Sequence, residues 1–62
     1  MTDSGQIEQA YAVELQQLFA IYLQSFTDAQ GNTDLEREAD EHFKKDVIHI
    51  RHVRERALNL IA

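Results

Sequence analysis

The stretch Gln30-Gly31-Asn32-Thr33-Asp34 decides the fold, because it is the one turn signal in a chain of 62 residues that lacks proline. Glycine readily adopts the left-handed backbone conformation that often ends a helix, so Gly31 predicts a helix end. Thr33 and Glu36 have the spacing of a capping box, in which each side chain accepts a hydrogen bond from the other residue's backbone amide. The stretch therefore predicts a turn between two helices.

The segments on either side of this turn are predicted to be long helices. One helix is expected over residues 4–29 and the other over residues 33–61, with the turn at 30–33. Asp3 with Gln6 repeats the capping pattern more weakly at the front of the chain. Residues 1–62 are thus expected to form a single all-α domain, a two-helix antiparallel hairpin.

Apolar residues at alternating spacings of three and four predict the faces on which the two helices meet. The seam expected for the first helix is Ala12, Leu15, Phe19, Tyr22, Phe26 and Ala29. The seam expected for the second helix is Ala39, Phe43, Asp46, Ile50, Val53, Ala57 and Leu60. Folding about the turn sets Phe26 opposite Ala39, Tyr22 opposite Phe43, Phe19 opposite Asp46, Leu15 opposite Ile50 and Ala12 opposite Val53. The predicted intrachain core is Phe19, Tyr22, Phe26, Phe43, Ile50 and Val53.

Asp46 is the one charged residue in these seams, and two interpretations of it are open. A buried carboxylate needs a partner, because an unpaired buried charge is costly, and such a residue can set helix register. Alternatively, the seam drifts around the helix and Asp46 lies at its edge in water.

The first helix is apolar over more than half of its circumference, which is wider than one neighbouring helix requires. Left exposed, these residues would form an apolar patch of a kind that monomers seldom show. Two hairpins packed together would cover the patch as a four-helix bundle, and twofold symmetry is the commonest way to build one. We therefore expect a homodimer, with an interface that includes Tyr11, Leu18, Val47 and Leu58.

The charges of the second helix are divided along its length. The chain has a net charge of −5, and residues 34–41 carry five acids and one arginine, whereas residues 44–56 carry five bases and two acids. This order suits the helix dipole, which favours acids early and bases late. It also favours a dimer in which antiparallel second helices place each acidic end beside a basic end.

Two further features of the second helix are candidate binding sites. Carboxylates and imidazoles one turn apart can share a metal ion, so one flank is a candidate metal site, with a solvated acidic flank as the simpler interpretation: Glu38, His42, Asp46 and His49. The basic stretch is a candidate for phosphate contacts, although its bases are spread around the helix: Lys44, Arg51 and Arg54. Helical-hairpin dimers of the Rop type bind RNA loops across one bundle face, and the expected architecture is similar to theirs in shape alone.

The composition and short motifs of the chain narrow the classes of function that remain. The chain has no cysteine, no Gly-rich phosphate loop and no zinc-hydrolase pattern, so neither an enzyme nor a cofactor is expected. Its apolar runs are too short for a membrane span, and its first residues lack the features of a signal peptide, which favours a cytoplasmic protein. The sequence favours a small interaction, regulatory or adaptor protein. Metal binding and RNA binding are the alternatives.

Overall fold

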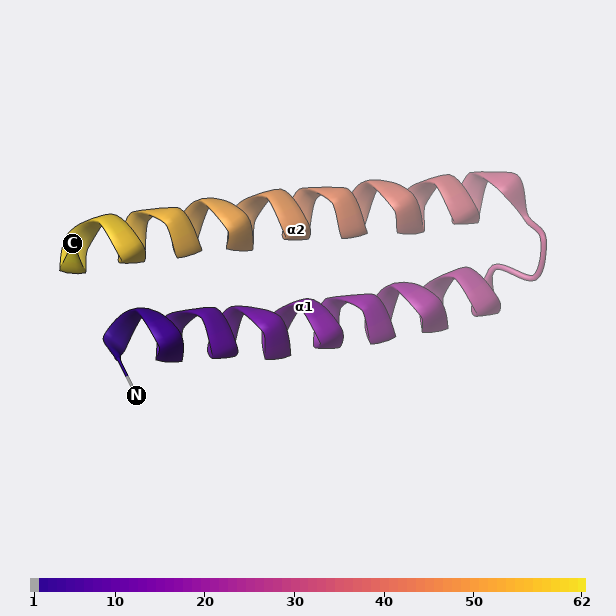
Figure 1. The fold of residues 1–62 in the computed structure, drawn as a ribbon. Helices are drawn as coiled ribbons and strands as arrows, with labels where there is room; N and C mark the ends of the chain where they lie inside the picture. The colour runs from indigo at the N-terminus through magenta and orange to yellow at the C-terminus, as the bar shows by residue number, and fades with distance from the viewer. Residues whose placement is uncertain (1) are drawn as a thin grey trace.

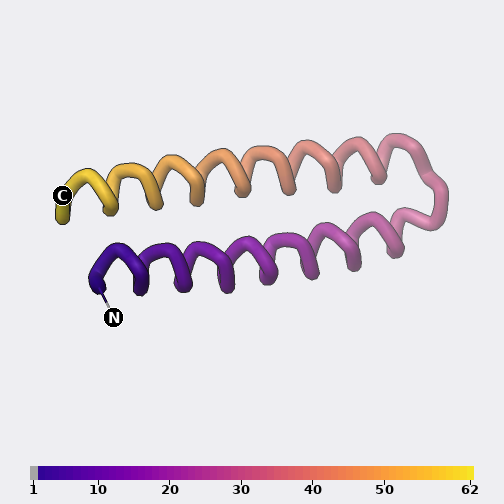
Figure 2. The backbone as a smooth tube through the Cα atoms, in the orientation of Figure 1, coloured from indigo at the N-terminus to yellow at the C-terminus, as the bar shows by residue number. Residues whose placement is uncertain are grey.

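The protein is an antiparallel helical hairpin, as the sequence predicts. A computed structural model describes residues 2–62, with helix α1 over Asp3–Asp28 and helix α2 over Thr33–Ile61 (Figure 1). Figure 2 shows the two helices side by side along their whole length, with both termini at one end and the turn at the other. The Cα atoms extend over 45 × 18 × 7 Å, so the molecule is a narrow plate one helix thick.

The turn uses two consecutive residues in the left-handed region. Gly31 has a φ of 81°, which confirms its predicted role, and Gln30 precedes it with a φ of 51°. The Asn32 amide then donates to the Ala29 carbonyl at 2.9 Å and closes the turn. Two positive φ angles in succession reverse the chain within a few residues, and this brings α2 back along α1.

The cap of α2 corrects the sequence prediction by one residue. Asn32 is the N-cap, and its side-chain oxygen accepts hydrogen bonds from the amides of Asp34 at 3.0 Å and Leu35 at 3.1 Å. Thr33 is instead the first residue of the helix, so the predicted capping box at this position is wrong. Asparagine is at least as good an N-cap as threonine, and its carbonyl satisfies two free amides here.

The cap of α1 differs from the prediction in the same way. Thr2 is the N-cap, and its hydroxyl oxygen accepts a hydrogen bond from the Gly5 amide at 3.1 Å. Asp3, the predicted cap, is the first residue inside the helix. Its carboxylate there is still well placed, because the positive end of the helix dipole favours an acid in the first turn.

The register of the hairpin agrees with the predicted pairing. The Tyr22 and Phe43 rings stack with their centroids 4.8 Å apart, as expected from their facing positions. Nearer the termini, the Arg54 guanidinium lies 5.2 Å from the centroid of the Tyr11 ring. The residue numbers of both pairs add up to 65, so one register holds from the aromatic layer to the open end.

The predicted core is wrong for three of its residues, because each helix is rotated about its own axis relative to the prediction. Phe19, Phe26 and Val53 were expected between the helices, but their exposed fractions are 53%, 40% and 50%. The half-buried residues that form the observed seam are Ile7, Tyr11, Leu15, Leu18 and Tyr22 on α1, and Glu36, Phe43, Val47, Ile50, Arg54, Ala57 and Leu58 on α2.

The observed seam lies one residue away from the predicted seam on each helix, through Leu18 and Val47 instead of Phe19 and Asp46. With the observed register, Leu18 lies level with Val47, and both are half-buried. The predicted seam would instead have placed Asp46 against Phe19 and buried a carboxylate without an ionic partner, which is costly. Asp46 is exposed, which confirms the interpretation that places it at the edge of the seam.

The interior of the hairpin is very small. Within residues 2–62, the buried residues are Ala29 and Ala39, with exposed fractions of 5% and 7%, and no large side chain is fully buried. Small side chains at these two positions let the helices approach each other next to the turn. No helix in the described part of the chain has the length and apolar character needed to cross a membrane.

Candidate interaction surfaces

Each helix presents two lateral faces beside the seam, because successive side chains turn by about 100° around an α-helix. We define the histidine face as the side of the hairpin that carries Ile21, Ser25 and Asp28 of α1 with Leu35, Glu38, His42 and Asp46 of α2. The opposite side is the phenylalanine face, defined as Ala12, Phe19, Leu23 and Phe26 of α1 with Arg37, Asp40, Arg51 and Glu55 of α2.

An open groove follows the histidine face between the two helices. It is lined by the residues that define the histidine face, together with Leu18, Tyr22, Ala29, Ala39 and Phe43. Aliphatic side chains and two small alanines lie in the groove, while Asp28, Glu38 and Asp46 add carboxylates. The groove is therefore an apolar channel with acidic edges.

The candidate metal ligands fall on this histidine face. Glu38, His42 and Asp46 line the groove, and all three are exposed, as is His49. Within residues 2–62, no three carboxylate or imidazole side chains are grouped closely enough to hold a metal ion. A metal site on this flank would thus need ligands from a second chain, and it stays a prediction.

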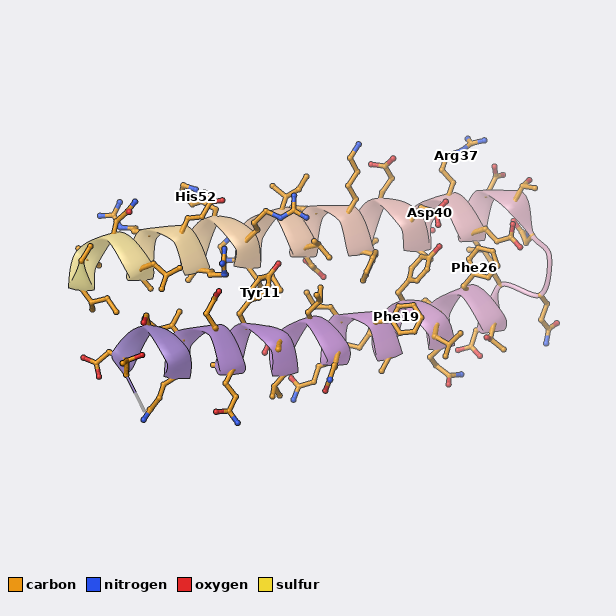
Figure 3. All side chains as sticks on the ribbon, in the orientation of Figure 1. Tyr11, Phe19, Phe26, Arg37, Asp40 and His52 are labelled. Atoms are coloured by element: carbon orange, nitrogen blue, oxygen red, sulfur yellow. The ribbon has the colours of Figure 1, made fainter. Side chains whose placement is uncertain are left out.

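The phenylalanine face carries large apolar side chains in water. Phe19 and Leu23 have exposed fractions of 53% and 54%, and Phe26 has 40%. Figure 3 shows Phe19 and Phe26 on the side of α1 nearer to α2, whereas Arg37 projects from α2 away from α1. The Phe19 ring also meets the edge of the Phe43 ring with centroids 6.4 Å apart. Phe19 thus covers one edge of the seam while presenting its other side to solvent.

A tyrosine–carboxylate bond crosses the seam in the aromatic layer. The Tyr22 hydroxyl donates to Asp40 Oδ1 at 2.6 Å, and this bond, with smaller contributions from burial and from the negative charge of Asp40, raises the pKa of Tyr22 above 10.0. Asp40 keeps its second carboxylate oxygen for another partner, because a carboxylate can accept through both oxygens. This link between the helices had no signal in the sequence beyond the register.

An ion pair closes the open end of the hairpin. Arg54 Nη2 donates to Glu8 Oε2 at 2.8 Å, and Arg54 Nε bonds to Glu8 Oε1, so the contact is bidentate. The hydrogen bonds to Arg54 lower the pKa of Glu8 below 4.5, and the same bonds raise the pKa of Arg54. Sequence reasoning missed Glu8, although the register places it within one helical turn of the position opposite Arg54.

This ion pair bears on the candidate nucleic-acid contacts. The guanidinium of Arg54 already holds Glu8 and lies over the Tyr11 ring. Lys44 and Arg51 are exposed. Lys44 and Arg51 are therefore more accessible to a phosphate than Arg54 is, and a role for the three bases in phosphate binding stays a prediction.

The predicted dimer-interface residues lie in the seam of the hairpin itself. Tyr11, Leu18, Val47 and Leu58 are all half-buried between α1 and α2. Each keeps some exposed surface, so a contact with a second chain stays a prediction for them. The more exposed large apolar residues are Val13, Phe19, Ile21, Leu23, Phe26, Leu35, Ile48, Val53, Leu60 and Ile61. The charge of Asp46 was the sequence signal that favoured this assignment, because a seam through Leu18 and Val47 avoids it.

Comparison with known proteins gives no match for this chain: no family model, no curated protein and no solved structure is similar to it.

Proposed function

We propose that this chain is a non-enzymatic protein-interaction module that self-associates into a helical bundle, and that it binds through its exposed apolar side chains. The observation that supports this proposal most directly is the exposure of ten large apolar side chains on a hairpin whose only buried residues within 2–62 are two alanines. Phe19, Leu23 and Phe26 share one side of α1, and an exposed apolar patch of this kind is typical of a protein–protein interface.

The chain exposes more area than a compact monomer of its mass, and the excess is similar to the area that each partner buries in a dimer. The chain exposes 5034 Å², whereas a compact monomer of 7.2 kDa exposes about 4100 Å² by the usual scaling with mass. The excess of about 900 Å² is close to the area of about 800 Å² that each partner buries in a standard interface. A second copy supplies this cover without any further component, and two hairpins make a four-helix bundle.

The radius of gyration supports the same interpretation. It is 14.5 Å for this chain, against about 10.6 Å for a compact domain of this length. A plate one helix thick cannot enclose a core, and stacking two plates creates one. A cytosolic location belongs to the proposal, since the sequence contains no cysteine for disulfide bonds.

Native mass spectrometry together with sedimentation over a wide concentration range tests the proposal. We expect a dimer whose dissociation on dilution is accompanied by loss of helical circular dichroism, because the separated hairpin has little core of its own. A chain that stays monomeric and fully helical at high concentration would overturn self-association. The exposed surface would then call for a different protein as its partner.

A further inference from the structure

We propose that the second copy packs on the phenylalanine face, antiparallel to the first, with the twofold axis passing level with Phe19. This inference rests on the proposed self-association and specifies its surface and register. In this arrangement α1 packs on α1 of the second copy and α2 packs on α2 of the second copy. Three observations lead to it: the sizes of the apolar side chains, the order of the charges and the register of the hairpin.

The apolar residues of α1 complement their own twofold image. With the axis at Phe19, this ring meets its counterpart in the second copy. Ala12 then lies opposite Phe26 of the second copy, and Gln16 lies opposite Leu23. The pairing of Ala12 with Phe26 sets a small residue against a large one, which allows these layers to interdigitate. Phe19, Leu23 and Phe26 have the exposed surface needed for these contacts.

The charged residues of α2 on the same face also complement their own image. Placing Arg37 opposite Glu55 of the second copy and Asp40 opposite Arg51 makes four ion pairs per dimer, since each pair occurs twice. All four residues are exposed, and Asp40 uses only Oδ1 for Tyr22. Between these pairs Lys44 meets Val47, whose surface the lysine stem can cover.

The two helices specify the same axis independently. The size match of α1 places the axis at residue 19, and the charge match of α2 places it at residues 45 and 46. In the observed register, residue 19 lies level with residue 46, because facing pairs such as Tyr22 with Phe43 add up to 65. The agreement between an apolar pattern and a charge pattern on different helices is the strongest support for this face.

With the twofold axis at this level, the histidine face is a poorer match for a second copy. The same twofold operation there would set Asp46 against Asp46, His42 against His49, and Glu38 against the apolar Val53. Like charges facing each other are unfavourable, and a carboxylate buried against valine would lack a partner. We therefore expect the histidine face, with its acidic groove, to point outward from the dimer.

Two matched substitutions on α1 test which face is used. Leu23 and Ile21 have exposed fractions of 54% and 63%, lie two residues apart, and point to opposite lateral faces. Leu23→Glu is expected to raise the dimer dissociation constant on the order of 100-fold, because it buries a carboxylate in both copies. Ile21→Glu is expected to change it less than about threefold, as is typical of surface substitutions away from a contact. Sedimentation equilibrium measures both, and circular dichroism at high concentration checks that each variant is helical.

A charge exchange tests the register along the face. Arg37→Glu alone and Glu55→Arg alone are each expected to raise the dissociation constant about tenfold, because each creates two like-charge contacts per dimer. The double variant restores the opposite charges and should return the constant to within about threefold of wild type. Additive losses in the double variant would overturn the proposed pairing.

Introduced thiols provide a separate test of the axis, because the chain has no cysteine of its own and any disulfide must come from the introduced residue. Phe19→Cys places two thiols at the axis, where Cα atoms can approach within the roughly 7 Å that a disulfide requires. Ala12→Cys is the matched control, since its two copies would lie about 21 Å apart along the helices. Disulfide-linked dimers of the first variant but not the second are the expected result.

The outcomes separate this inference from the proposed self-association. A wild-type chain that does not dimerise overturns the proposed self-association. A wild-type dimer that survives Leu23→Glu, or that dissociates with Ile21→Glu, leaves self-association standing and overturns the choice of face. Cross-linking through Ala12→Cys with none through Phe19→Cys overturns the position of the axis.

Discussion

The half of the hairpin next to the turn and the half next to the termini are held together in different ways. Beside the turn, Tyr22 stacks on Phe43 with centroids 4.8 Å apart and contacts the tilted Phe26 ring at 5.8 Å, while the buried Ala29 and Ala39 let the helices approach each other. Near the termini the seam is mainly aliphatic, with half-buried Ile7, Leu15 and Ile50, and an ion pair joins Glu8 to Arg54, whose guanidinium lies over the Tyr11 ring.

This difference shows where the stability of one chain resides. Burial of aromatic surface stabilises the turn half without requiring any group to be ionised. An exposed ion pair adds little free energy, depends on both ionisation states and is screened by salt. The turn half is therefore expected to hold the hairpin together, while the ion pair orients the open end. Leu60 and Ile61 fit this view, with exposed fractions of 75% and 46% at the end of α2.

The largest effect is expected from Phe43→Ala, which removes the centre of the aromatic layer. Phe43 contacts both Tyr22 and Phe19, but it is half-buried, so the expected loss is about 2 kcal/mol, less than for a fully buried phenylalanine. Chemical denaturation followed by circular dichroism measures it. Ile48→Ala, at an outer position that is 53% exposed, is the control and should change stability little. Equal losses for the two variants would show that the aromatic layer does not dominate.

The second effect concerns the turn itself. Gly31→Ala is expected to cost about 1 kcal/mol, because a side chain at a φ of 81° is strained, although a Cβ there meets no atom within 4 Å. Gly31→Asn should cost less, since asparagine tolerates the left-handed region better than alanine. Thermal unfolding at a fixed protein concentration ranks the variants. A neutral alanine variant would mean that the turn has an alternative conformation without a positive φ.

A smaller effect, confined to acid pH, is expected at the open end. The pKa of Glu8 is lower in the folded chain than its ordinary 4.5, so the ion pair stabilises the fold above that pH. This contribution is lost as the pH falls through the lowered folded value. Glu8→Gln should therefore reduce stability slightly at neutral pH and flatten the decline on acidification. Adding salt should shrink the difference from wild type, and a difference independent of salt would contradict an ionic origin.

The smallest effect is expected at alkaline pH in the turn half. The pKa of Tyr22 is raised above 10.0 by its bond to Asp40, so the bond stabilises the fold below that pH and is lost as the pH rises through the raised folded value. Tyr22→Phe should remove this loss and keep most of the stacking on Phe43. Absorbance titration of the phenolate checks the pKa directly. Asp40→Asn should move one of the two tyrosine titrations towards lower pH, and no movement would contradict the assigned cause.

Much of the fold was predictable because it depends on local features of the chain. Gly31 and the residues around it specify the turn, and the absence of proline allows two uninterrupted helices. The length of the turn then determines which residues lie level with each other, so the pairing of Tyr22 with Phe43 followed from counting. The predicted cap of α2 was wrong by one residue, since Asn32 and Thr33 are adjacent and both are competent caps.

Only the tertiary structure decided how each helix is rotated about its axis. On α1 two overlapping stripes, one through Leu18 and one through Phe19, are both apolar, so the sequence of that helix does not favour one over the other. The choice depends on what α2 presents at the same level, which is Val47 for one rotation and Asp46 for the other. Contacts between the helices settle it, because packing two aliphatic side chains together is favourable, whereas burying a lone carboxylate is costly. The same rotation leaves Phe19, Leu23 and Phe26 in water and so creates the surface on which the proposed dimer depends.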